Sequence, residues 1–236
     1  MSRHPDIDKV CPCALNTIRN PDAQIAFTGS TATGRRIAIA AAESNLKGVT
    51  LELGGKSPNI IFADANLAEA AKWAAFGVFE NMGQSCSAGT RILVEESAYD
   101  EFVKLFVQAT EAFQVGSPSD PETFQGPQVS KVQFEKILGY IEEGKKGGAK
   151  LLTGGGRHGT RGYYVKPTVF GDVTNDMKIA REEIFGPVAA LIKFKDEAEA
   201  IKIANDTEVS LCLNESRDRG LTAVRTGICC SLDECQ

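Results

Sequence analysis

Short apolar runs rich in β-branched residues alternate with helix-length amphipathic segments along most of this 236-residue chain. Val49–Leu53, Arg91–Glu95 and Val188–Phe194 are typical of strands, and the longer segments between such runs carry apolar residues at helical spacing. Parallel strands need a crossover long enough to hold a helix, and this alternation supplies one. The sequence therefore predicts an α/β fold with a largely parallel sheet.

The helical segments also predict core faces. After Asp64, a good N-cap, alanine and other apolar residues recur at helical spacing, and we expect this helix to end near Gly83 with Trp73 and Phe76 in the core. Val115–Gln128 holds prolines and glycines and predicts a long surface connection. A short buried strand is expected at Ile25–Thr28, and further strands at Pro58–Ala63, Lys150–Thr153, Tyr163–Val165 and Thr168–Phe170. Further helices are expected over Ser30–Asn45, from Tyr99 to Phe113, from Val129 to Gly144 and over Asp196–Asp206.

Composition excludes several classes of function. The net charge is −5 and aromatic residues make up 7%, so neither nucleic acid nor an anionic membrane is an expected partner. No apolar run approaches the roughly 18 residues that a membrane span needs, and the N-terminus lacks a signal-peptide pattern. We expect a cytoplasmic globular protein.

The seven cysteines are unevenly distributed. Cys-x-Cys and Cys-Cys pairs lack the Cys-x-x-Cys spacing of structural zinc sites, and without a secretory signal a disulfide framework has little support. We therefore expect no metal. Six cysteines lie near the ends of the chain and one stands apart: Cys11, Cys13, Cys212, Cys229, Cys230, Cys235 and the isolated Cys86.

Cys86 is the candidate nucleophile. It lies in Phe79–Arg91, where Gly83, Ser85 and other small neighbours allow another molecule to approach the sulfur and backbone N–H groups to face an oxyanion. The alternative is a small buried hydrophobe, which is how most free cysteines behave.

Glu52 is the candidate proton acceptor. It stands between two leucines at the end of a β-prone run, where burial would raise the pKa of its carboxyl group toward neutrality. The alternative is an ordinary exposed glutamate on a strand. Upstream, a strand, a glycine turn and a helix N-terminus at Ser30–Gly34 make a possible phosphate site, which a plain capped helix explains about as well.

Four segments of the chain carry a resemblance to a known family: Phe27–Gly34, Leu51–Pro58, Phe79–Cys86 and Glu182–Val188. In this order they resemble the active-site and cofactor motifs of the NAD(P)-dependent aldehyde dehydrogenases. The resemblance covers roughly Ile25 to Glu208. It implies a three-layer parallel-sheet catalytic domain over 54–208 and a remnant of a Rossmann-like cofactor domain over 25–53.

The resemblance also implies residue roles. Cys86 would attack an aldehyde, hydride would leave for a nicotinamide, and Glu52 would activate the water that releases a carboxylic acid. The cofactor would be NAD or NADP, the substrate a small-molecule aldehyde, and the intact protein a homo-oligomer. The positions that match cofactor-binding residues are Gly29, Ser30 and Gly34 near the pyrophosphate, Glu183 at the nicotinamide ribose and Phe185 beside the ring.

Both ends of the chain depart from the family pattern. Residues 1–24 include Val10–Gln24, which shows no periodicity and is therefore expected to be a loop or disordered, and 209–236 is expected to be a disordered tail. We hypothesise that Val10–Gln24 and 209–236 are translated non-coding or frame-shifted sequence. Family segments that bind the cofactor and complete the oxyanion hole have no counterpart here, so we expect this chain alone to be inactive.

Two other functions remain open on the sequence. The chain could be a non-catalytic fragment that binds full-length subunits. It could also be a thiol esterase that uses Cys86 and Glu52 without a cofactor.

Overall fold

The computed structural model describes residues 24–207 and 214–216. The expected loop before Gln24 and most of the expected tail lie outside these residues. The chain divides into two compact units, Met1–Gly54 and Gly55–Gln236. Within the described ranges, no helix is both long and apolar enough to cross a membrane.

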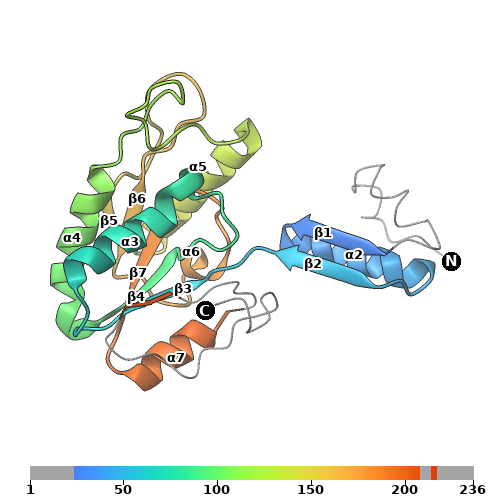
Figure 1. The fold of residues 1–236 in the computed structure, drawn as a ribbon, viewed down its shortest axis with the longest axis horizontal. Helices are drawn as coiled ribbons and strands as arrows, with labels where there is room; N and C mark the ends of the chain where they lie inside the picture. Colours follow the sequence, from blue (N-terminus) through green and yellow to red (C-terminus); the bar gives the residue numbers. More distant parts are fainter. Residues whose placement is uncertain (1–23, 208–213, 217–236) are drawn as a thin grey trace. The chain divides into compact units, whose positions relative to one another are not determined.

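The first unit is a strand–helix–strand element. Strands β1 (Ile25–Gly29) and β2 (Val49–Leu53) pair in parallel, and helix α2 (Thr31–Ser44) connects them (Figure 1). Ile25 packs with Ile37, Ala40 and Ala41 of the helix. The expectation that β1 is a buried strand is wrong beyond Ile25, because alternate residues face the side of the pair that α2 does not cover.

The second unit is built on a six-stranded sheet in the order β5-β6-β7-β4-β3-β8. All neighbouring strands are parallel except β5 and β6. The strands are β3 (Pro58–Ile61), β4 (Arg91–Glu95), β5 (Lys150–Thr153), β6 (Thr168–Gly171), β7 (Val188–Phe194) and β8 (Asn214–Ser216). The predicted α/β fold with a largely parallel sheet is confirmed.

Helices cover both faces of this sheet, which gives three layers (Figure 1). Ile92 and Val94 of β4 pack in the cluster formed with α3 (Leu67–Phe79) and α4 (Tyr99–Glu111), whereas Leu93 packs on the opposite face with α7 (Glu197–Asn205). The other helices are α5 (Lys131–Lys146) and α6 (Lys178–Arg181), which share a second cluster on the side of α7, and the short 3₁₀ helices η2 (Glu80–Gly83) and η3 (Glu96–Ala98).

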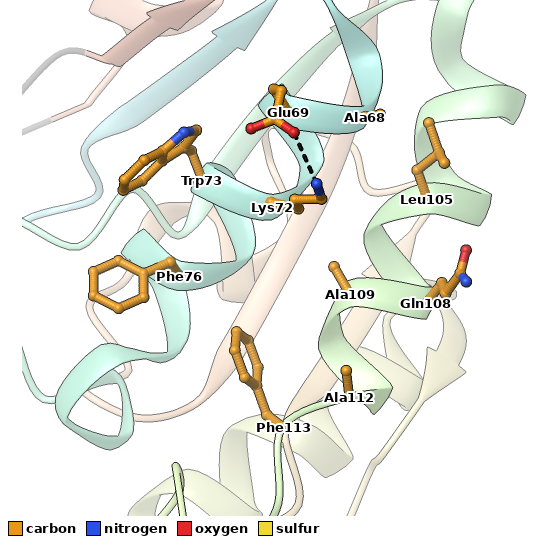
Figure 2. A pocket seen from close by; sticks show the side chains of 10 residues that line it. All are labelled: Ala68, Glu69, Lys72, Trp73, Phe76, Leu105, Gln108, Ala109, Ala112 and Phe113. Atoms are coloured by element: carbon orange, nitrogen blue, oxygen red, sulfur yellow. Dashed lines mark hydrogen bonds and ion pairs between the residues drawn. The ribbon is translucent and has the colours of Figure 1, made fainter.

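The expectation that Trp73 and Phe76 belong to the core is wrong. Their exposed fractions are 69% and 40%. Helix α3 buries a face made largely of alanine, because small side chains let α4 and the sheet approach closely, and its large aromatic residues turn outward. With Phe113 they line an apolar groove of about 730 Å³ between α3 and α4, whose side chains Figure 2 shows.

Other expectations also need correction. Tyr163–Val165 is not a strand, since only Val165 forms an isolated bridge, with Arg157. The connection Val115–Gln128 is not all surface, because Gln125 is fully buried and its side-chain amide donates to the carbonyl oxygen of Phe79. Within the expected disordered tail, Asn214–Ser216 forms β8, which pairs with an edge of β3 that would otherwise lack a partner strand.

Candidate active site

The loop that carries Cys86 begins with three residues in the left-handed region. Helix α3 ends at Phe79, earlier than the expected end near Gly83, and Asn81, Met82 and Gly83 have φ values of 49°, 57° and 69°. Each non-glycine residue in this conformation costs about 1–2 kcal/mol. The Asn81 side chain offsets part of this cost by donating to the carbonyl oxygen of Gln84 at 3.0 Å. We call residues 80–90 the cysteine loop.

The cysteine loop lies against the backbone of residues 182–187. A Cβ atom added to Gly83 would lie 2.3 Å from the carbonyl carbon and oxygen of Gly186. A second contact holds the loop from another side, because the Gln84 side chain accepts a hydrogen bond from the backbone N–H of Val129 at 3.0 Å. The structure thus brings two of the four motifs, around Cys86 and around Glu183, into direct contact.

Cys86 carries an exposed free thiol. It lies in a turn in which the N–H of Ala88 donates to the carbonyl oxygen of Ser85 at 3.3 Å, and the hydroxyls of Ser85 and Ser87 are 3.1 Å apart. Most free cysteines are small, buried hydrophobic residues, and Cys86 is not one of them. An accessible sulfur among small residues suits a nucleophile. The assignment of Cys86 as the nucleophile stays a prediction.

Helix α5 holds residues 182–187 in place. The Gln133 amide donates to the carbonyl oxygens of Ile184 and Phe185 at 2.9 and 2.8 Å, and Lys136 donates to that of Glu183 at 3.3 Å. These bonds support Phe185, whose φ of 56° is unfavourable for a bulky residue. The sequence did not predict a role for Gln133 and Lys136. The one indication in the sequence is that they lie three residues apart, on the same face of a helix.

Burial shifts the pKa values of two charged side chains, Glu183 and Lys56. Burial raises the pKa of the half-buried Glu183 carboxyl group, opposed by Lys136, by Lys56 and by a hydrogen bond from the N–H of Gly55. Burial also lowers the pKa of Lys56 to about 7, assisted by Arg91 and opposed by Glu183. Among the described residues, neither Oε1 of Glu183 nor Nζ of Lys56 has a hydrogen-bond partner.

Arg91 anchors the C-terminal end of α7 beside this pair. Its guanidinium donates to the carbonyl oxygens of Ile203 at 2.7 Å and Ala204 at 2.8 Å, and to the side chain of Asn175 at 3.0 Å. The side chain is fully buried. Arg91 therefore has a structural role as a helix cap, and its charge also acts on Lys56.

The remaining predicted site residues lie in the first unit. Glu52 is half-buried and pairs with Thr28, next to Gly29, so it lies at the carboxyl end of the two parallel strands. Open α/β sheets bind ligands at this end. Ser30 is an N-cap, since its hydroxyl accepts from the N–H of Thr33 at 3.3 Å, and Gly34 lies against Leu53. Glu52 and Cys86 belong to different units, and their pairing stays a prediction.

The described part of the chain contains no group of three or more histidine, cysteine or acidic side chains placed to hold a metal ion. A family model described as the aldehyde dehydrogenase family matches residues 16–213. The chain belongs to this family. The matched interval is longer at both ends than the four motifs indicated.

Known aldehyde dehydrogenases share both the sequence and the fold. An aldehyde dehydrogenase of Emericella nidulans is 56% identical over 225 residues, which is 95% of this chain and 42% of that protein. The solved aldehyde dehydrogenase KauB from Pseudomonas aeruginosa has a TM-score of 0.84 and 47% identity, over 87% of this chain and 42% of that one. An NAD-dependent aldehyde dehydrogenase from Sinorhizobium meliloti has a TM-score of 0.85 and 41% identity, over 88% of this chain and 41% of that one. The chain thus spans about two-fifths of the length of these relatives.

Proposed function

We propose that this chain carries the cysteine nucleophile of an NAD(P)-dependent oxidation of aldehydes to carboxylic acids. The observation that carries the proposal is the exposed Cys86 thiol on a loop packed against the backbone beside Glu183. The Cys86 thiolate forms a bond to the aldehyde carbonyl carbon, and the resulting oxyanion is stabilised by nearby backbone N–H groups. After oxidation, Glu52 takes a proton from the water that cleaves the thioester, which releases the acid and restores the thiol.

The residues present fit a dinucleotide cofactor. The buried, unpartnered Oε1 of Glu183 is an acceptor suited to a ribose hydroxyl, and Phe185 stands two residues along the same segment. The N-terminus of α2 at Ser30, with Gly29 and Gly34, suits a phosphate. The bound cofactor, NAD or NADP, would supply the hydride acceptor.

We further propose that the 236-residue chain alone does not complete the reaction. It spans 42% of the Emericella nidulans relative, and the described part of the first unit has two strands and one helix. A two-stranded sheet is marginal by itself, and we expect only weak nucleotide binding. An intact enzyme would act as a homo-oligomer on a small aldehyde.

Two assays on the purified chain test this function. Peptide mass spectrometry after treatment with p-nitrophenyl acetate should find the acetyl group on Cys86, and Cys86→Ala should abolish it, whereas Ser87→Ala should keep it. Incubation with acetaldehyde and NAD should yield no NADH. An unmodified Cys86 peptide would refute the assignment of Cys86 as the nucleophile. NADH formation would refute the proposal that the chain alone is inactive. Ester turnover that needs Cys86 and ignores millimolar NAD would favour the thiol esterase.

A further inference from the structure

The side chain of Gln84, two residues before Cys86, connects the cysteine loop to a distant part of the chain. Its Oε1 accepts a hydrogen bond from the backbone N–H of Val129 at 3.0 Å, and its Nε2 donates to the carbonyl oxygen of Asn81 at 3.4 Å. Asn81 returns the contact, because its side-chain amide donates to the carbonyl oxygen of Gln84 at 3.0 Å. The Gln84 amide therefore closes the loop on one side and ties it to Val129 on the other.

Val129 lies at the entry to helix α5. The next residue, Ser130, is the N-cap of α5, and its hydroxyl accepts from the N–H of Gln133 at 3.2 Å. The Gln133 amide in turn donates to the carbonyl oxygens of Ile184 and Phe185. The start of α5 thus supports both the cysteine loop and the segment 182–187. The Val129 side chain is 76% exposed, so its backbone N–H, rather than its packing, makes this connection.

Cys86 lies between two ties that lead out of the cysteine loop. Gln84 is one, and the other is the carbonyl oxygen of Thr90, which accepts from the N–H of Ala190 at 2.9 Å. The turn that contains Cys86 is closed by a bond within the loop, from the N–H of Ala88. The loop also starts in the left-handed region, and such a backbone persists only where its surroundings hold it. The Gln84 side chain is the tie that a substitution can remove without altering the sheet.

We propose that Gln84 is a positioning residue, whose amide oxygen fixes the Cys86 turn relative to α5 and so relative to the segment that α5 holds. An oxyanion formed at Cys86 is stabilised only if the backbone N–H groups of the loop point at it, and small displacements of reacting groups have large effects on rate. The role of Cys86 as the nucleophile rests on the proposed function. The tie between Gln84 and Val129 is a property of the folded chain.

The test compares two reactions of Cys86 in the whole chain, each followed by peptide mass spectrometry. With p-nitrophenyl acetate, the thiolate forms a bond to the acetyl carbon through an oxyanion and p-nitrophenolate leaves. With iodoacetamide, the thiolate displaces iodide and no oxyanion forms. Gln84→Met should slow acetylation about 10-fold, since a displacement of ~1 Å can cost up to about 100-fold, and should leave alkylation at the wild-type rate.

Two further variants control for structural effects. Gln84→Glu keeps an oxygen that can accept from the N–H of Val129, so it should keep most of the wild-type ratio of acetylation to alkylation. Gln108→Met, at an exposed position of α4, should behave as the wild type in both reactions. Gln84 is only partly buried, so none of these substitutions opens a cavity in the core.

A second measurement does not require Cys86 to react with esters. A trifluoroacetonyl label on the thiols gives a ¹⁹F NMR signal for Cys86, which Cys86→Ala identifies. This signal should shift or broaden in Gln84→Met and should keep its wild-type position in Gln84→Glu. A wild-type ratio of acetylation to alkylation in Gln84→Met, or an unchanged ¹⁹F signal, would overturn the proposal. Absence of acetylation in the wild type would refute the proposed function, and the ¹⁹F comparison would still decide whether Gln84 positions Cys86.

Discussion

Gly83 and Gly186 touch through their backbones, so that a Cβ atom on Gly83 would lie 2.3 Å from the Gly186 carbonyl group. Gly83 is also in the left-handed region, with φ at 69°. One contact therefore sets both the course of the cysteine loop and its position against the segment of Glu183 and Phe185. Glycine is required here for two independent reasons, conformation and space.

Gly83→Ala should lower the free energy of unfolding by about 2–4 kcal/mol, because alanine is strained at this φ and its methyl group overlaps backbone that has little room to move. Urea denaturation measures this change. The matched control is Gly77→Ala in α3, where a Cβ meets nothing within 4 Å. That substitution should stabilise the protein by about 0.5–1 kcal/mol. Equal effects of the two substitutions would contradict the close approach.

Stability should depend on pH through Lys56. Its pKa falls from 10.5 to about 7 on folding, so between these values the unfolded chain binds more protons and stability increases with pH. The destabilisation is complete below about pH 7 and disappears toward pH 10.5. Lys56→Met should therefore be more stable than the wild type by roughly 5 kcal/mol at pH 6, and by much less at pH 10. Thermal or urea unfolding of both proteins at the two pH values measures the difference; a gap that does not change with pH would refute it.

The groove between α3 and α4 offers an optical test, because Trp73 is the single tryptophan of the chain. With 69% of the residue exposed, its fluorescence should be red-shifted and readily quenched by acrylamide. Trp73→Ser should change stability by no more than about 0.5 kcal/mol. Phe79→Ala, at a fully buried position of the same helix, should cost about 3–5 kcal/mol. Blue-shifted Trp73 fluorescence that acrylamide quenches poorly would contradict the exposure of Trp73 in the groove.

Much of the fold could be predicted from local pattern. Three strands have the expected bounds: Val49–Leu53, Arg91–Glu95 and Val188–Phe194. The bounds are clear in the sequence because each apolar run stops at residues of a different kind, such as Gly54 or Pro187. Periodicity could not place Trp73 and Phe76, since α3 is apolar around most of its circumference and the buried face is chosen by close packing of alanines.

Less of the site than of the fold could be predicted from the sequence. The Cys86 and Glu183 motifs are adjacent in space, but their contact depends on two glycines more than 100 positions apart. The burial of Lys56 is a tertiary property, and lysine usually lies at the surface. Whether Glu52 acts on the same intermediate as Cys86 stays a prediction, which a kinetic experiment can decide.

The most direct test of the pairing of Cys86 with Glu52 is the lifetime of the acetyl group on Cys86, followed by intact-mass spectrometry after a pulse of p-nitrophenyl acetate. Glu52→Gln should be acetylated as fast as the wild type but should lose the group about 100-fold more slowly, because a general base contributes 10²–10⁴-fold. Glu43→Gln, in α2 of the same unit, should behave as the wild type. Equal lifetimes in the wild type and in Glu52→Gln would contradict the account.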